Sequence, residues 1–353
     1  MAPIDLRVTR RPRFTHRLVR ERGAVSLWFL LTLPALLMFG AFAVDVPRVF
    51  AVTGELQNAA DAAALAGATA LSTGTSGPNW AGAATMATAA IPLNASDGTK
   101  LSSGTVQAGY WDVAASAPAV IAPSTVTLPA PDSEVPAVQV TISRSASTNG
   151  LVGLLLGALL GRPTTVDSAT AVAIVAPPST VLAGGLFPVV MDQCVYAQFW
   201  DSTANQPKID PSTNQPYEFE IGNGQQYGSS CDAGQWTTFL SSFDNVPSVL
   251  DLITNGNPSP VSIGDSIWLQ PGVKDTIYSS VPTGVTVVVP VANQVDADSY
   301  VSVVAFAAFH IDASYGGSSK YIQGHFVGGY TLPTQASGVG PNYGGYVAPR
   351  LAL

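Results

Sequence analysis

Two cysteines offer the clearest covalent chemistry in this chain of 353 residues. Cys194 and Cys231 both lie in the C-terminal half, well separated in the sequence. A metal site would need additional ligands near them in a recognisable spacing, and the sequence shows no such motif. If this part of the chain is exported, two isolated cysteines are expected to form one disulfide rather than remain free thiols.

Three histidines and the lack of a catalytic motif limit the enzymatic chemistry that the sequence supports. His310 and His325 lie in alternating patterns typical of strands. The motifs G-x-S-x-G, G-x-x-x-x-G-K-[ST] and H-E-x-x-H are absent. We therefore predict no catalytic, cofactor-binding or metal site. A hydrolase site assembled from distant residues around His310 or His325 stays open as an alternative.

Two carboxylate pairs could bind calcium through their oxygen atoms. Glu218 and Glu220, like Asp296 and Asp298, are two residues apart, which places both side chains on one side of a strand. Neither pair belongs to a ligand-dense D-x-D-x-D-G loop, so solvated surface charge is the expected state. An acidic region of this kind would also suit a surface adhesin or ligand-binding module.

Small residues recur at helical spacing within residues 53–71. The spacing of three and four residues predicts a helix with one face of small side chains, which permits another element to approach closely. That face could pack on the protein's own domain or on helices of a partner, and the pattern alone does not choose between them. The face consists of Leu56, Ala59, Ala60, Ala63, Ala64 and Gly67.

This helix continues from an apolar run at residues 24–44, whose polar side chains are Ser26 and Thr32. At about 1.5 Å per helical residue the run reaches roughly 30 Å, the thickness of a bilayer's hydrocarbon core. The run is longer than the apolar core of a signal peptide, which has about 7–15 residues. It therefore predicts a retained transmembrane helix that continues into an Ala-rich helix.

Charge is distributed unequally on the two sides of this run. Residues 1–22 carry seven Arg against Asp5 and Glu21, whereas residues 49–353 carry seven Lys and Arg against twenty Asp and Glu. Positively charged flanks stay in the cytoplasm, which predicts a cytoplasmic N-terminus and an exported C-terminal region. The acidic exported region argues against nucleic acid as a partner.

Beyond residue 71 the pattern changes from helix to strand. Residues 80–90 predict a second Ala-rich helix, whereas residues 103–112 and 137–143 alternate as half-buried strands do. Residues 151–160 form a second apolar block, too short to span a bilayer and expected to be a buried helix or one lying against the membrane surface. Further strand candidates are residues 169–175, 185–190, 266–270, 285–291, 300–310 and 320–328.

These patterns predict an α+β protein in which the membrane-spanning helix and its Ala-rich continuation precede a β-rich extracytoplasmic region. The expected organisation is a basic cytoplasmic tail at 1–22 and a transmembrane helix at 24–44. A helix with a mixed α/β extracytoplasmic region follows at 45–176, and a β-rich extracytoplasmic domain at 180–353.

The segments Arg22-Gly-Ala-Val-Ser-Leu-Trp-Phe, Ala43-Val-Asp-Val-Pro-Arg48 and Leu56-Gln-Asn-Ala-Ala-Asp-Ala-Ala-Ala-Leu-Ala-Gly67 resemble the N-terminal region of TadG-like proteins. These proteins belong to the tight-adherence (Tad) machinery that assembles Flp pili in bacteria. Pro47 is a minor departure from the pattern. The resemblance covers about 50 residues, and the segment from Leu56 to Gly67 is its most specific part.

The resemblance implies a single-pass inner-membrane protein with a periplasmic domain that acts in pilus assembly and surface attachment, without enzymatic activity. Its implied partners are the membrane bilayer and other Tad or Flp assembly proteins or pilins, with the helix after the anchor packing on them. The surface adhesin and the membrane-anchored envelope hydrolase remain the alternative functions.

Overall fold

The computed structural model describes residues 24–73, 77–222, 224–228, 230–242, 244–272, 275–333 and 336–352. The basic tail expected at residues 1–22 lies outside the described residues. The described chain divides into two compact units. Unit 1 holds the residues up to Val49 together with residues 153–165, and unit 2 holds residues 50–152 and the chain from Val166 onwards.

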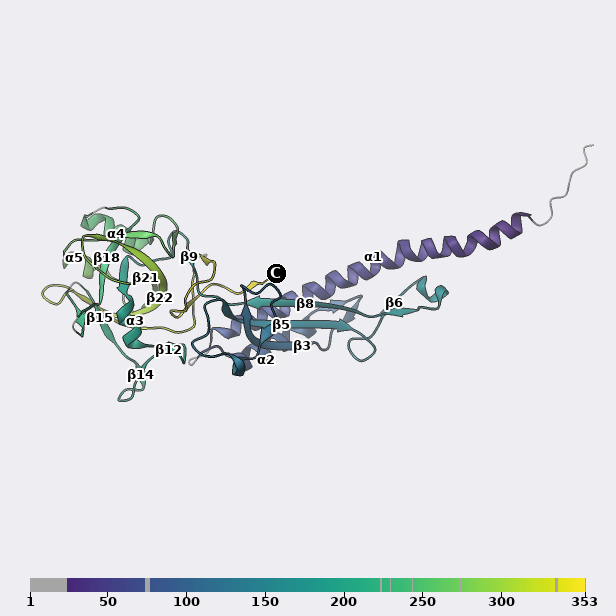
Figure 1. The fold of residues 1–353 in the computed structure, drawn as a ribbon, viewed down its shortest axis with the longest axis horizontal. Coiled ribbons are helices and arrows are strands. Elements are labelled where there is room, and N and C mark those ends of the chain that lie inside the picture. The colour runs from purple at the N-terminus through teal and green to yellow at the C-terminus, as the bar shows by residue number, and fades with distance from the viewer. Residues whose placement is uncertain are drawn as a thin grey trace, which may run out of the picture. The chain divides into compact units, whose positions relative to one another are not determined.

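One helix, α1 (Ala24–Leu71), contains both the apolar run and the Ala-rich continuation (Figure 1). Pro34 and Pro47 lie inside it without ending it, although each removes a backbone N–H from the helical ladder. A strong helix-forming composition supports the second half, where Ala and Leu dominate. The predicted continuity of the two helical segments is therefore confirmed.

A five-stranded antiparallel sheet follows α1 in the sequence, with the order β27-β8-β5-β3-β4. Its strands are β3 (Thr105–Asp112), β4 (Val120–Ile121), β5 (Glu134–Arg144), β8 (Asp167–Ile174) and β27 (Arg350–Leu351). The C-terminal strand β27 thus returns the chain to a sheet otherwise built from residues 105–174.

The two faces of this sheet are covered differently because side chains alternate along β5. Val138, Val140 and Ile142 pack in one core with the second half of α1 and with α2 (Trp80–Ala90). Val135 and Ala137 belong to a smaller core that includes residues of β8. The side chain of Asn79 caps α2 by accepting from the Gly82 N–H at 2.9 Å.

A second, seven-stranded sheet has the order β15-β23-β22-β20-β18-β10-β21, and an additional pairing of β21 with β22 closes part of it into a ring. All neighbours are antiparallel except β10 and β21, which are parallel. Its strands are β10 (Val189–Asp192), β15 (Phe219–Ile221), β18 (Gly234–Phe239), β20 (Ser266–Leu269), β21 (Val285–Ala292), β22 (Ser299–Tyr315) and β23 (Tyr321–Phe326).

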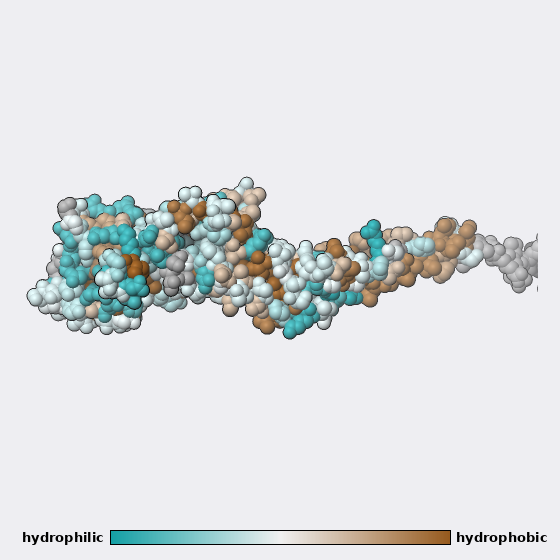
Figure 2. Space-filling view, turned by 90° about the horizontal axis from the view of Figure 1, so that it is seen from below, coloured by the Kyte–Doolittle hydropathy of each residue, from teal (hydrophilic) through white to brown (hydrophobic). Residues whose placement is uncertain are grey.

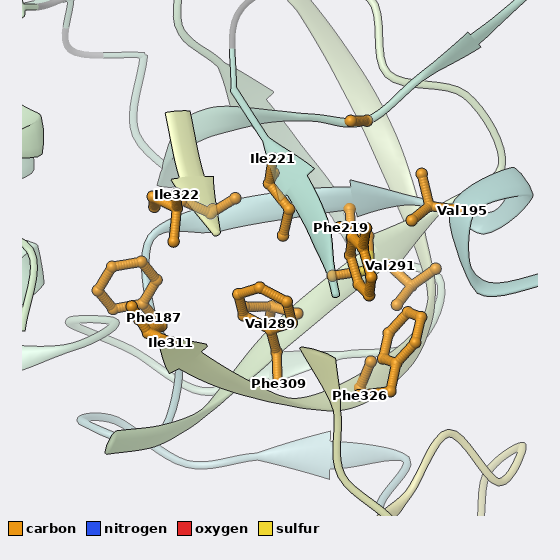
Figure 3. Packing of buried hydrophobic residues seen from close by; sticks show 14 of the residues in the cluster. Phe187, Val195, Phe219, Ile221, Val289, Val291, Phe309, Ile311, Ile322 and Phe326 are labelled. Carbon is orange, nitrogen blue, oxygen red and sulfur yellow. The ribbon is translucent and has the colours of Figure 1, made fainter. Parts of the chain in front are cut away.

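Alternation along these strands again separates two hydrophobic cores. Val289 and Phe309 pack with the aromatic residues of β15 and β23 in the larger core, and Figure 3 shows these side chains converging between the strands. Val288 and Phe306 lie one and three residues from Val289 and Phe309, on the opposite face, and belong to a separate core with β20. The sheet therefore has hydrophobic packing on both faces.

Short helices and two-residue strands complete the described fold. The helices are α3 (Gln193–Phe199), α4 (Val246–Asn255), α5 (Asp275–Tyr278), η1 (Ile91–Leu93), η2 (Pro123–Thr125) and η3 (Gly157–Leu160). The paired short strands are β1 (Ala95–Ser96) with β2 (Thr99–Lys100), β6 (Val152–Gly153) with β7 (Thr164–Thr165), β11 (Trp200–Asp201) with β12 (Gln206–Pro207), β13 (Ile209–Asp210) with β14 (Gln215–Pro216), β16 (Gln226–Tyr227) with β17 (Cys231–Asp232), and β24 (Tyr330–Thr331) with β26 (Gly345–Tyr346). A three-stranded sheet has the order β19 (Val261–Ser262), β9 (Thr180–Val181), β25 (Ala336–Ser337).

The α+β prediction is confirmed, since one long apolar helix precedes several sheets. The apolar block at 151–160 differs from expectation because it forms the hairpin β6–η3–β7 instead of an α-helix. Gly157 has room only for a hydrogen, since a Cβ there would stand 2.6 Å from the Arg162 carbonyl oxygen. Pro163 then lacks the N–H that a continuing helix would need.

Candidate functional site

The first half of α1 exposes almost every large apolar side chain that it carries. From Leu27 to Val44 these side chains are between 37% and 75% exposed, and Figure 2 shows them as a continuous hydrophobic surface along the helix. A helix of this length and composition can cross a membrane. A hydrophobic surface of this size marks an interaction with a membrane or a partner.

A polar group inside this apolar surface is satisfied within the helix. The Thr32 hydroxyl donates to the Trp28 carbonyl oxygen at 2.8 Å. In a hydrocarbon environment an unpaired hydroxyl would be costly, so this bond removes the main obstacle that Thr32 presents to insertion. The first half of α1 is accordingly suited to be a membrane anchor.

The apolar run ends at Asp45, whose side chain is only 6% exposed. The backbone N–H groups of Leu155, Leu156 and Gly157 donate to its carboxylate at 2.8, 3.1 and 2.7 Å. These are charge-assisted bonds, which are among the stronger hydrogen bonds in proteins. Asp45 therefore holds the turn of the β6–β7 hairpin against α1 within unit 1.

The small-residue face of α1 lies inside unit 2. Leu56, Ala60 and Ala63 have no solvent-accessible surface, and Ala59, Ala64 and Gly67 are also buried. They pack with α2 and the five-stranded sheet in one core. The burial favours packing on the protein's own domain, one of the two possibilities left open by the sequence. A partner could reach this face only if these side chains left the core.

Gly67 lies at a close approach of α1 to α2. A Cβ added at Gly67 would stand 2.8 Å from the Ala87 Cβ and 2.9 Å from the Ala83 carbonyl oxygen. Because one of these obstacles is backbone, it cannot rotate away. Only glycine fits this position at the observed helix spacing.

The predicted disulfide between Cys194 and Cys231 is present and joins α3 to β17. Asp192 precedes α3 and accepts from the Cys194 N–H at 2.8 Å. Burial raises the pKa of the Asp192 carboxyl, an effect that the hydrogen bond from Cys194 partly offsets. Its carboxylate and the two sulfur atoms lie close together, but sulfur atoms in a disulfide are not available as thiolate ligands.

His310 and His325 lie directly opposite each other on β22 and β23, and their ring centroids are 5.1 Å apart. Asp312 accepts from His325 Nδ1 at 2.8 Å and lies 3.9 Å from His310 Nε2. Thr286 hydrogen-bonds His310 Nδ1 at 2.9 Å. The cluster brings two imidazoles, a carboxylate and the Thr286 hydroxyl together. Among these contacts, Thr286 is the side chain that an adjacent imidazole could activate as a nucleophile.

The carboxylate pairs considered for calcium make separate contacts with neighbouring amides. Glu218 accepts from Gln323 at 2.6 Å, and Glu220 accepts from Gln225 at the same distance. Asp296 accepts from Gln294 at 2.8 Å. Among the described residues, the one group of three ligand atoms close enough for a metal ion contains the disulfide cysteines. The carboxylates of these two pairs do not belong to that group.

A pocket in unit 2 is lined by prolines and tyrosines, among them Pro129, Pro131, Tyr196 and Tyr343. The Tyr196 hydroxyl donates to the Asn342 carbonyl oxygen at 2.7 Å, and the Tyr343 ring stacks on Tyr196 at 3.6 Å. Burial raises the pKa of both tyrosines. Their hydroxyls stay protonated at neutral pH, so the pocket offers hydrogen bonds and ring surfaces rather than a reactive phenolate.

Sequence reasoning missed the roles of Asp45 and Asp192 and the contacts of Asp312 with the two histidines. Asp45 directly follows the apolar run, and a carboxylate at that position is an available signal, but its contacts lie about 110 residues further along the chain. Asp192 is two residues from Cys194 and fits an N-cap position, which could have been recognised. Asp312 shares a strand with His310 at the i+2 spacing that puts both on one face.

Comparison with known proteins shows that the N-terminal region is similar to two protein families. Residues 23–70 match the family described as Flp pilus-assembly TadE/G-like, and residues 66–173 match the family described as Tad-like Flp pilus-assembly. The two matches together span α1, α2 and the strands β3, β5 and most of β8. No curated protein and no solved structure matches the chain.

Proposed function

We propose that the chain is a non-enzymatic, membrane-anchored component of bacterial Flp pilus assembly and surface attachment, because residues 23–173 match the TadE/G-like and Tad-like families of Flp pilus assembly. The observation that carries this proposal is that the matched residues contain both the apolar run of α1 and the sheet on which the second half of α1 packs.

The proposed location is the bacterial inner membrane, with a single span, the N-terminus in the cytoplasm and the C-terminal region in the periplasm. The seven Arg before the apolar run support this orientation, and the disulfide suits an oxidising compartment. The proposed extracytoplasmic regions are residues 45–176 and 180–353. Strand β27 belongs to the second region in the sequence and pairs with β8 of the first.

The proposed partners are the bilayer and other Tad or Flp assembly proteins or pilins. The small-residue face of α1 is occupied by the protein's own core, so contacts with partner proteins are assigned to the exposed surface of the chain. The acidic surface, with no cluster of basic residues after residue 49, does not favour nucleic acid.

Deletion and complementation test the assembly role. A strain lacking the protein should lose Flp pili and surface attachment, and the full chain should restore both. A version in which residues 1–44 are replaced by a cleaved signal peptide should be exported but should not restore pili. Normal piliation in the deletion strain would contradict the proposal.

A second complementation experiment distinguishes the assembly function from the hydrolase alternative. The variant with His310→Ala and His325→Ala removes both imidazoles of the cluster but leaves the anchor and the sheet pairing in place. We expect this variant to restore pili as well as the wild-type chain does, at equal abundance. Loss of pili with normal protein abundance would favour an enzymatic site at the cluster.

A further inference from the structure

The hairpin formed by β6, η3 and β7 ends in an apolar tip, which we define as residues 154–159. The Leu154 N–H donates to the Pro163 carbonyl oxygen at 2.8 Å, and the Arg162 N–H donates to the Gly157 carbonyl oxygen at 2.9 Å. The N–H groups of residues 155–157 are bound by Asp45. The backbone of the tip is thus largely hydrogen-bonded, as an environment poor in water requires.

The tip nevertheless exposes its large side chains. Leu155 is 59% exposed and Leu159 is 64% exposed, although both belong to one of the most apolar stretches outside the anchor. A turn that satisfies its backbone polar groups while presenting leucines outward has the properties of a surface that contacts an apolar phase.

The tip also lies beside the apolar run of α1 within unit 1. A Cβ at Gly40 would stand 3.5 Å from Leu156 Cδ1, so the helix backbone and this leucine are in close contact. Gly40 is four residues before the end of the apolar run at Val44, or about 6 Å at 1.5 Å per residue. That depth matches the roughly 5–10 Å to which apolar side chains enter the boundary between headgroups and acyl chains.

We propose that residues 154–159 are a second membrane contact, seated in the leaflet from which the exported region emerges. This proposal rests on the membrane placement of α1 in the proposed function. The occupant is the lipid bilayer, because the tip is continuous with the helix surface that the bilayer covers. Arg162 is exposed at the base of the tip, where a guanidinium can bind lipid phosphate.

Two contacts would fix the depth at which α1 ends. A single apolar helix can slide by a residue or two, because exchanging one apolar side chain for the next at the boundary changes little. Asp45 holds the tip at a defined position on the helix, and the tip stays at the boundary because its leucines favour the acyl region. The end of the anchor is then held in register with the membrane surface.

The test uses the full chain, reconstituted into vesicles of phosphatidylethanolamine and phosphatidylglycerol. Leu159→Cys and Leu155→Cys are each labelled with an environment-sensitive fluorophore, while the disulfide leaves no native thiol to react. Nitroxides carried at a shallow or a deep position on the lipid acyl chain then report depth. Leu36→Cys marks the anchor, and Leu93→Cys, an exposed leucine of unit 2, is the matched control.

We expect a blue shift at both tip positions and loss of their fluorescence with the shallow nitroxide. The label at Leu36 should be quenched by the deep nitroxide, and the label at Leu93 by neither. Quenching at Leu36 without quenching at either tip position would overturn the tip contact alone. Lack of quenching at Leu36 would overturn the membrane placement of α1 and the tip contact with it. Equal shallow quenching at Leu93 would also overturn a specific contact by the tip.

Discussion

At the scale of single residues, Asp45 is a buried carboxylate whose partners are backbone N–H groups. It lies at the end of an apolar helix, is buried, and receives backbone N–H groups from three consecutive residues of another segment. A buried carboxylate is tolerated only when such bonds replace its lost hydration. Its removal should therefore act on the hairpin rather than on the helix.

We expect Asp45→Ala to loosen the hairpin turn at residues 155–157. A hydrogen bond to a charged group contributes about 1.5–3 kcal/mol, so loss of even one raises the frequency of local opening by about 10- to 100-fold. Hydrogen exchange of a peptide covering residues 152–165, measured on the full chain in micelles, reports this opening.

The control for this variant is Glu55→Gln on the same helix. Glu55 is exposed and accepts from one backbone N–H, that of Asp97, at 2.6 Å. Exchange at residues 152–165 should be unchanged in that variant. Unchanged exchange in Asp45→Ala as well would show that the three bonds do not hold the turn.

Asp192 provides a prediction with a defined sign in pH. Its folded pKa is raised, chiefly by burial, so the folded state binds a proton more tightly than the unfolded state does. Asp192 therefore favours folding when it is protonated. This contribution to the free energy of unfolding is fully present below the unfolded pKa of about 3.9 and is lost as pH rises through the folded pKa. Asp192→Asn keeps a capping oxygen without the charge. It should therefore melt at a higher temperature than the wild type at pH 7.5, and the gap should close towards pH 4.

Asp210→Asn is the control with the opposite sign. The side chain and backbone N–H of Ser212 lower the pKa of Asp210, so its contribution is present at neutral pH and is lost as pH falls through the folded pKa. The wild type should be the more stable of this pair at pH 7.5. The same pH trend in both comparisons would show that burial does not determine the titration of Asp192.

At the scale of elements, the fit between α1 and α2 depends on a glycine. Gly67→Ala improves helix propensity by about 1 kcal/mol, but the added methyl group meets both the Ala87 Cβ and a backbone oxygen below 3.0 Å. Overpacking of this kind costs about 1–3 kcal/mol. We expect the steric term to exceed the propensity term and the melting temperature to fall.

Gly54→Ala is the matched control, since Gly54 lies on the same helix and a Cβ there would have no neighbour within 4 Å. Without a clash, the propensity term acts alone and should stabilise the chain by about 0.5–1 kcal/mol. Thermal unfolding followed by circular dichroism distinguishes the two. A Gly67→Ala variant at least as stable as Gly54→Ala would contradict the close approach.

The elements also show how far sequence reasoning extends. The apolar run and the alternating strands were predictable because burial imposes periods of 3.6 and two residues. The two-residue strands were not, because distant partners such as β8 for β27 determine them. The small-residue face indicated that something approaches α1 closely, but small side chains carry no information about which element does so. Likewise, the disulfide followed from two isolated cysteines, whereas the Asp45 contacts depend on how a distant loop folds.

At the scale of the whole molecule, known families match the first part of the chain. The family matches end at residue 173, and the partly closed seven-stranded sheet follows without a matching protein or structure. The first region is therefore the part to which the proposed function assigns anchoring and assembly. The second region is where this chain differs in sequence from what the families describe, and variants there should change attachment rather than membrane insertion.

The orientation of the whole chain in the membrane follows from the charges on the two sides of the apolar run. With seven Arg before the apolar run and an acidic region after it, the positive flank should remain in the cytoplasm. A phosphatase that folds only outside the cytoplasm should be active when fused after Leu353, and a cytoplasmic reporter fused there should be inactive. Deleting residues 24–44 should reverse both results, because the tail alone cannot export the domain. A cytoplasmic reporter that is active on the intact chain would place the domain, the disulfide and the hairpin tip on the wrong side of the membrane for the function proposed above.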